Sequence, residues 1–452
     1  MYPFFVIRRV IILKKRHIPR PLIIVPAVFG ICFIIYFFLN YFFSPYWDSV
    51  YPPTGYFSVA SLRRAEPSDT IYTKQQACVD IDYLAKYLGR VHPDYIDGFP
   101  DELSELIQNK KDSFGEEVGT FELWHAAAEI TAAVGDSETL VMPSFEQDYL
   151  VDYVNKINSG YTPVSVNGKT IDEILSENSR YFSYDTKAYG EQLIIALIQS
   201  KDGLKFLNID ADNLEIVYSS DNEKTQTVKY TSADFYPYED AVNMITQVTS
   251  EPYTSEIVPE SNYALITINS CDYDSEFKKF VYNFFGEVDS KDIGNVIVDL
   301  SAAASGSSQV ADEIIMYLTV DEVTIPGGMQ RLGPYMMKWD TASQRINHYD
   351  DLLYDGNLYV LISEDTASAG VMAAEMFIDN RLAVSIGEPC GTLPDCYGDV
   401  AVFQTPNAAL SFQVSTKKFE RIDKTKSGLP LEPDILWGIG EPCDKVKELI
   451  SE

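Results

Sequence analysis

The stretch "NLYVLISEDTASAGVMAAEMFIDNRLAVSIG", Asn357 to Gly387, decides the fold. Its first apolar run predicts a strand, "AGVMAAEMFI" has helical spacing, and "LAVSIG" predicts a second strand. Continuous Val, Ile and Leu runs joined through a helix are typical of a βαβ unit in a parallel sheet that is buried on both faces. The sequence therefore predicts an α/β core.

The segments on either side of this unit extend the pattern. Upstream, "NYALITINS" and "NVIVDL" predict strands, and "SEFKKFVYNFFGEV" and "QVADEIIMYL" predict helices. Downstream, "AVFQTP" and "LSFQVST" predict a β-hairpin or two edge strands. We therefore expect several βαβ units in one mainly parallel sheet.

Two further regions precede this core. From about Tyr72 to Ala133, "VDIDYLAKYL" and "FELWHAAAEITAAV" place apolar residues at helical spacing. The later "YTPVSVNGKTIDEIL" predicts a strand, a turn at Asn167-Gly168 and a helix that starts at Thr170. Such a module either offers a groove to an extended peptide or serves only as a packing appendage.

The first 47 residues differ from the rest in charge and hydropathy. Leu22 to Phe43 runs 22 residues without a charge, long enough to cross a bilayer as one helix. Six basic residues precede Asp48 and no acid does, so we expect the N-terminus in the cytoplasm and the main domain outside. The run is longer than the core of a usual signal peptide, and "FFSPYWDS" has no small-x-small cleavage site. An uncleaved anchor in the cell membrane is therefore favoured.

Charge narrows the class of partner. Of the 35 Lys and Arg residues, six lie before residue 48. The chain from residue 48 onward therefore has 29 basic residues against 67 Asp and Glu residues, a net charge of −38. A surface this acidic argues against nucleic acid. The chain has no D-x-D-x-D-G loop and no C-x-x-C pair, so neither a calcium site nor structural zinc is indicated. A Cys390–Cys396 bridge is sterically conceivable.

Ser368 stands between the first strand and the helix of the opening stretch. A serine there is most often only a helix N-cap. It is also well placed for nucleophilic chemistry, because ligands bind at the carboxyl ends of parallel strands and a helix N-terminus attracts negative charge. The small residues of "SAAASGSS", which follow the strand ending at Asp299, are expected at the same edge and would let backbone N–H groups approach a reacting carbonyl.

From His92 to Asp434 the chain resembles the S41, or tail-specific (C-terminal processing), serine peptidases, especially the bacterial branch without a full PDZ domain. The resemblance is carried, in order, by "HPDY", "AAVGDSET", "VSVNGKTIDEIL", "VIVDLSAAASGSS", "EDTASAGVMAAEMFIDN", "IGEPCGTLPDCYGD", "LSFQVSTKKF" and "LEPD". It implies a crotonase-like (ClpP-like) core, Ser368 as nucleophile, cleavage near the C-termini of proteins, and no metal or organic cofactor.

The resemblance fails at the residues that would activate the serine. "GDSET" places Glu138 where the family has its histidine, and Leu393 stands about where another branch has a lysine. After the central strand, Ser301, Ala303 and Ser305 replace the family's Arg, Asn and first Gly, so that Gly306 alone remains. A carboxylate is a weak base unless burial raises its pKa, so Glu138 could accept the serine proton only if it is buried, and the favoured interpretation is a polar residue that fills the place of the histidine.

The oxyanion would then be held by backbone amides at Gly306, Ala369 or Ser305. The other basic side chains offer no clear substitute for the missing base. We expect His92 to be structural, His125 to be a half-buried helix residue, His348 to lie in a polar loop, and Lys417 and Lys418 to lie exposed on an edge strand.

The sequence and the resemblance together predict seven segments. They are a cytoplasmic basic tail (1–21), a transmembrane anchor (22–43), a stalk (44–71), a helical region (72–149), a small PDZ-like or β-rich module (150–255), an S41 protease-like core (256–440) and a C-terminal tail (441–452). The expected function is that of a membrane-anchored, extracytoplasmic serine peptidase acting on peptides or proteins, with reduced or lost activity. The alternative is an inactive homologue that binds peptides or cell-envelope proteins.

Overall fold

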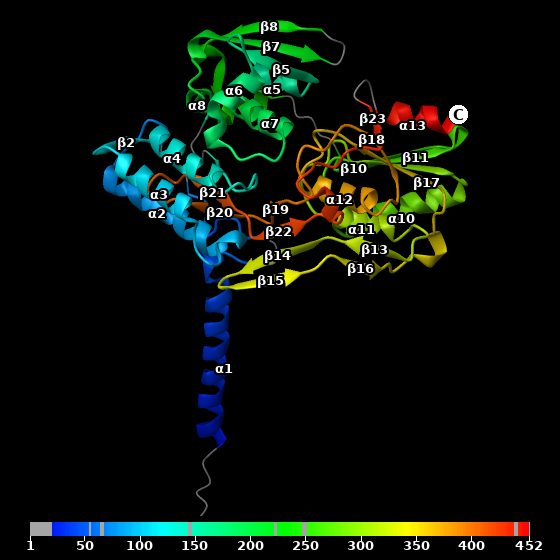
Figure 1. Ribbon diagram of the computed structural model, residues 1–452, viewed down its shortest axis with the longest axis horizontal. Helices are drawn as coiled ribbons and strands as arrows, with labels where there is room; N and C mark the ends of the chain where they lie inside the picture. The colour runs from blue at the N-terminus through cyan, green and yellow to red at the C-terminus, as the bar shows by residue number, and fades with distance from the viewer. Residues whose placement is uncertain are drawn as a thin grey trace, which may run out of the picture.

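The computed structural model describes residues 20–53, 56–63, 67–142, 147–220, 224–245, 251–437 and 442–451 (Figure 1). Five of the six basic residues that set the expected orientation lie outside the described residues, as does nearly all of the expected cytoplasmic tail.

Helix α1, Arg20–Phe43, stands out from the body of the protein as a stem (Figure 1). From Val28 to Phe38 its apolar side chains are exposed, among them Phe29 at 71% and Phe33 at 67%. In the described part of the chain it is the one helix long and apolar enough to cross a membrane, over Val28 to Tyr46. The expected apolar N-terminal helix is therefore present.

The segment after α1 lies against the body, although we expect a stalk there. Tyr46 is fully buried, and its hydroxyl donates a hydrogen bond to the carbonyl of Arg331 at 2.7 Å. The N–H of Val50 donates to the carbonyl of Val402 at 2.7 Å. The Pro, Ser and Gly content that suggested a stalk does not reveal these long-range contacts.

Helices dominate the next region, as expected. Helix α2 starts with a capping box between Thr73 and Gln76 and buries Ala77, Ile81 and Leu84 on one face. The expected hairpin near residues 401–416 packs here and pairs with a strand from the helical region, in the order β20-β21-β3. The elements are β1 (Ile71–Thr73), α2 (Lys74–Val91), α3 (Asp101–Ser113), β2 (Glu117–Gly119), α4 (Thr120–Ala132), β3 (Val141–Met142), β20 (Ala401–Gln404) and β21 (Ser411–Val414).

A small α/β module follows, with the predicted strand, turn and helix. Asn167 takes a positive φ of 50° at the turn, and Thr170 caps the helix after it. Its elements are β4 (Asp148–Leu150), α5 (Val151–Ile157), β5 (Tyr161–Val166), β6 (Lys169–Thr170), α6 (Ile171–Asn178), α7 (Lys187–Ile198), α8 (Lys201–Phe206), β7 (Leu214–Ser220), β8 (Gln226–Tyr230), β9 (Phe235–Pro237) and α9 (Tyr238–Met244).

The core is a six-stranded sheet in the order β10-β11-β12-β17-β18-β23, parallel except for β10. Alternate residues of each strand face opposite layers, so that Val296 and Val298 pack with α10, α11 and α12 while Ile297 packs with α13. The strands are β10 (Tyr253–Val258), β11 (Tyr263–Ile268), β12 (Asn295–Asp299), β17 (Asn357–Ile362), β18 (Val384–Gly387) and β23 (Ile435–Leu436). The helices are α10 (Ser275–Ser290), α11 (Gln309–Ile315), α12 (Ala369–Ile378) and α13 (Pro442–Ser451), so the expected C-terminal tail forms a packed helix with Val446 buried.

Six strands join the core to the rest of the protein. They are β13 (Glu322–Ile325), β14 (Gly327–Leu332), β15 (Tyr335–Trp339), β16 (Ala342–Arg345), β19 (Tyr397–Gly398) and β22 (Lys417–Glu420). Four of them form a sheet in the order β15-β14-β22-β19. The expectation that Lys417 and Lys418 lie on an edge strand is wrong, because β22 is internal to this sheet. Both lysines are half-buried and pair with Asp399 and Asp94 at 3.0 and 3.1 Å.

The cysteines are unpaired. Cys390 and Cys396, the pair for which a bridge was conceivable, are both buried and both free, as are the other four.

Candidate active site

Ser368 lies where strand β17 turns into helix α12, at the carboxyl edge of the parallel sheet. Its backbone has φ 47° and ψ −117°, a region that residues with a side chain rarely adopt and that costs on the order of 1–3 kcal/mol. Although Ser368 is the N-cap of α12, its side chain makes no capping hydrogen bond. The helix-cap interpretation therefore does not explain the serine, whose hydroxyl is directed elsewhere.

The partner of that hydroxyl is Glu138. The Glu138 carboxylate accepts a hydrogen bond from the Ser368 side chain, across 230 residues of chain. Burial and the charge of Asp136 raise the pKa of Glu138 to about 7, while the hydrogen bond from Ser368 lowers it. A carboxylate with a pKa near neutrality is a far better proton acceptor than an ordinary one.

The loop that carries Glu138 is fixed from two sides. Asp136 accepts hydrogen bonds from the Glu138 N–H at 2.8 Å and the Thr139 hydroxyl at 2.5 Å. The side chain of Gln413, in strand β21, donates to the Glu138 carbonyl at 2.7 Å. The hairpin of the chain's C-terminal part therefore holds the loop that faces Ser368.

His92 is fully buried, as a structural histidine should be, but it lies behind this loop. Its Nε2 is 3.3 Å from the Asp136 carboxylate. Nothing in "HPDY" or "GDSET" alone indicates that these two side chains meet. The other histidines are placed as expected, since His125 is half-buried and bonds the Phe206 carbonyl at 2.9 Å, and His348 lies in a loop.

A third carboxylate completes the site. Asp185 accepts a hydrogen bond from the N–H of Leu393 at 3.2 Å and another from the Ser137 side chain. Burial and the charge of Asp136 raise the pKa of Asp185. The charges of Asp136 and Asp185 both raise the pKa of Glu138. The position where another branch has a lysine therefore contributes only its backbone. Among the described residues no group of His, Cys, Asp and Glu side chains is arranged to hold a metal ion.

The small-residue loop after β12 contacts the turn between β17 and α12, which carries Ser368, through Ala303. The carbonyl of Ala303 accepts a hydrogen bond from the N–H of Ala367 at 3.0 Å. A Cβ on Gly370 would lie 1.9 Å from the same carbonyl, so only glycine allows this approach. The expected meeting of the two loops at one sheet edge is therefore observed.

The three backbone amides expected at the oxyanion position are not equivalent. Ala369 is the first residue of α12, directly after Ser368. Gly306, at φ 108°, forms an isolated bridge with Cys271, and Ser305 gives its carbonyl to the N–H of Cys271 at 2.8 Å. The structure thus places Ala369 beside Ser368, and it places Gly306 and Ser305 against the segment that follows β11.

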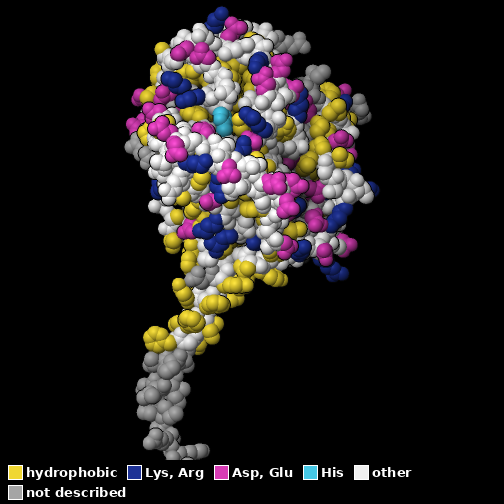
Figure 2. All heavy atoms as spheres, turned by 60° about the vertical axis from the view of Figure 1, so that its left-hand side comes forward, with side chains coloured by type: hydrophobic (Ala, Val, Ile, Leu, Met, Phe, Trp, Pro, Cys, Tyr) yellow, Lys and Arg dark blue, Asp and Glu magenta, His cyan; other side chains and the backbone are white. Residues whose placement is uncertain are grey.

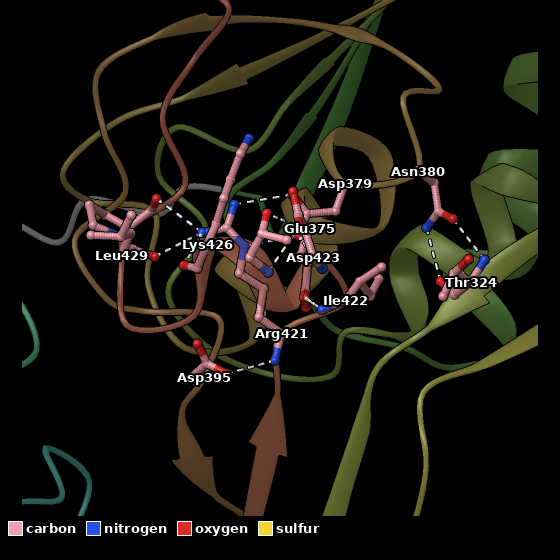
Figure 3. Close-up of polar contacts among 12 residues, drawn as sticks. Thr324, Glu375, Asp379, Asn380, Asp395, Arg421, Ile422, Asp423, Lys426 and Leu429 are labelled. Carbon is pink, nitrogen blue, oxygen red and sulfur yellow. Dashed lines mark hydrogen bonds and ion pairs between the residues drawn. The ribbon is translucent and has the colours of Figure 1, made fainter.

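A buried ion pair holds helix α12 from behind (Figure 3). Arg421 is 1% exposed and binds both carboxylate oxygens of Asp379, at 2.9 and 3.1 Å. Glu375, one turn earlier on α12, accepts from the N–H of Ile422 at 2.6 Å, and burial raises the pKa of Glu375 to about 8. These contacts fix the helix whose N-terminus carries Ser368.

The small module covers the opposite side of the site. Gln192 of α7 donates to the Asp365 carboxylate at 2.6 Å, and the Thr186 hydroxyl donates to the carbonyl of Gly391. Both acceptors belong to the segments that flank Ser368 and Leu393. The module therefore borders the site, whichever of its two expected roles it has.

The comparisons agree with this picture. The family model described as "Peptidase family S41" matches residues 262–436 of the chain. Mature CPAF complexed with lactacystin is similar in structure, with a TM-score of 0.60 at 13% identity over 84% of this chain and 98% of that one. Mature CPAF alone gives 0.59 at 14% over 84% and 97%.

Weaker likeness extends to the photosystem II D1 C-terminal processing protease, with a TM-score of 0.47 at 12% identity over 83% of this chain and 97% of that one. No curated protein matches the chain by sequence. The family match and the CPAF structures support a mixed α/β fold similar to that of S41 peptidases.

Proposed function

We propose that the protein is a membrane-anchored, extracytoplasmic serine peptidase in which Ser368 is the nucleophile and Glu138 the general base. The observation that carries the proposal is the hydrogen bond from the Ser368 hydroxyl to the Glu138 carboxylate at a strained strand-to-helix elbow. The S41 family and its peptide-bond chemistry support the reaction class. The crotonase-like core, the segment boundaries and the preference for protein C-termini belong to the proposal and rest on the resemblance.

The chemistry follows from this pair. Glu138 takes the proton as Ser368 Oγ attacks the scissile carbonyl carbon, and the N–H of Ala369 faces the oxygen on which negative charge develops. The protonated Glu138 then gives its proton to the leaving amine as the C–N bond breaks. Water, deprotonated by the same carboxylate, attacks the acyl-enzyme and releases the new C-terminus together with free Ser368.

The same cluster of acids limits the rate. The negative charges of Asp136 and Asp185 raise the pKa of Glu138, which makes its carboxylate a stronger base, but the same charges oppose the developing oxyanion. Expected turnover is therefore slow compared with a site that uses histidine.

A fluorophosphonate probe tests the proposal on the full-length protein in detergent. We expect the wild type to be labelled, Ser368→Ala to remain unlabelled, and Glu138→Gln to react far more slowly. Ser275→Ala is the matched control, because Ser275 also begins a helix beside the core sheet but lies outside the site. Absence of labelling in the wild type would overturn the enzymatic proposal and favour an inactive peptide-binding homologue.

A further inference from the structure

The turn between strands β14 and β15 contacts the C-terminal end of the stem, where the stem joins the body. Gly333 in this turn has φ 61°, and a Cβ placed on it would lie 2.9 Å from the carbonyl oxygens of both Tyr41 and Phe42. Tyr41 and Phe42 belong to the last turn of α1, Arg20–Phe43. If α1 spans the bilayer, its last turn lies where hydrocarbon gives way to head groups, and the Gly333 turn must lie at the same depth.

Strand β15 continues from this turn along the base of the body. It is the edge strand of the sheet β15-β14-β22-β19, and the side chains of Tyr335, Met337 and Trp339 share one face by the alternation of a strand. Tyr335 is 57% exposed and Met337 is 40% exposed. Figure 2 shows hydrophobic side chains continuing from the stem onto the adjoining end of the body.

A crevice of about 600 Å³ separates the stem from this base. Aromatic side chains of α1, including Phe33, Phe37 and Tyr41, line one wall, and Pro334 and Arg90 line the other. Aromatic rings beside a cation suit the boundary layer of a membrane, where acyl chains meet phosphates.

We propose that the Gly333-Pro334 turn and the exposed face of β15 rest in the interfacial layer of the bilayer, against phospholipid. This inference rests on the proposed membrane anchor but not on the proposed peptidase activity. It places the body directly on the membrane surface, because the contact is continuous with the span. A second copy of the chain pairing with the β15 edge is the competing occupant.

Tryptophan quenching in vesicles of zwitterionic phospholipid tests the contact. The full-length protein is reconstituted with lipids brominated near the head group, and the emission of an added tryptophan is obtained by difference from the wild type. We expect Tyr335→Trp to be quenched strongly. Tyr282→Trp is the matched control, because Tyr282 is 51% exposed on α10, away from the stem, and should be quenched little.

A third variant tests the proposed membrane anchor separately from the proposed interfacial contact. Phe33→Trp lies within the stem and should be quenched by lipids brominated deep in the acyl chain. Quenching at position 33 with none at position 335 above the Tyr282→Trp control would overturn the interfacial contact and leave the anchor intact. Absence of quenching at position 33 would overturn both.

Discussion

The proposed catalytic pair rests on the contact between Ser368 and Glu138. The strained backbone of Ser368, its uncapped hydroxyl and its contact with Glu138 are the features of a nucleophile held for reaction. A carboxylate can replace a histidine as base only if its pKa rises, and burial beside Asp136 supplies that rise.

The first prediction concerns the pH dependence of fluorophosphonate labelling. Glu138 acts only when deprotonated, so the labelling rate of the wild type should rise with pH through a midpoint near the Glu138 pKa of about 7. Removing the negative charge of Asp185 with Asp185→Asn should lower the pKa of Glu138 and move the midpoint to lower pH. A rate that is flat with pH from 5 to about 9 would show that Glu138 is not the base.

The second prediction concerns stability. The pKa of Glu138 is raised from 4.5 in the unfolded chain to about 7 in the fold, so the folded state binds a proton that the unfolded state releases between these values. Stability should therefore fall as pH rises through this range. Glu138→Gln removes the cost of burying the charged carboxylate. It should raise the free energy of unfolding by at most about 3 kcal/mol at pH 8 and leave it unchanged near pH 4. Thermal unfolding at both pH values measures the difference, and equal melting shifts at the two would contradict it.

The resemblance pairs Glu138 with Ser368 as the position of its base, but the local sequence does not show that the two side chains are in contact. Local pattern places Ser368 at an elbow, and the resemblance aligns Glu138 with a missing histidine. The pKa of Glu138 depends on Asp136, three-dimensional burial and Asp185, and none of these is a property of the local sequence. The contact of His92 with Asp136 is missed for the same reason.

At the scale of elements, long apolar strands and helices are predicted well and short polar strands are not. Continuous Val, Ile and Leu runs predict the parallel strands β11, β12, β17 and β18. Strands β13 to β16 have mixed composition and are stabilised by pairing with distant partners, as in the pairing of β14 with β22. The same pairing places Lys417 and Lys418 inside a sheet.

The third prediction concerns helix α12. Arg421→Ala leaves the Asp379 carboxylate buried without its partner, and breaking such a buried pair costs about 3–5 kcal/mol. The free energy of unfolding in denaturant measures this loss. Lys424→Ala is the matched control, because its ion pair with Glu420 is exposed and its loss should change stability by less than about 1 kcal/mol. Similar losses in the two variants would show that Arg421 does not anchor the helix.

At the scale of the whole molecule, charge and hydropathy divide the chain into two environments. Between Val28 and Tyr41 the stem exposes aromatic and aliphatic side chains, whereas the body carries most of the 67 acids. Exposed apolar surface of this extent is unfavourable in water, at roughly 25 cal/mol per Å². The large negative charge of the body, by contrast, opposes association between copies in water.

The last prediction is the orientation of the chain in the membrane. Six basic residues precede or begin the stem and no acid does, so the N-terminus should be retained in the cytoplasm and everything beyond Asp48 exported. A reporter enzyme that matures only outside the cytoplasm, fused after Glu452, should be active. The same reporter fused before Met1 should be inactive, and this serves as the control.

A variant with the basic residues replaced tests the cause of this orientation. Glutamine at positions 8, 9, 14, 15 and 16 should reduce the activity of the C-terminal fusion, because basic residues retained in the cytoplasm set the orientation of the helix. An inactive fusion after Glu452 in a chain that is made and membrane-bound would place the Ser368 site in the cytoplasm and reverse the proposed topology.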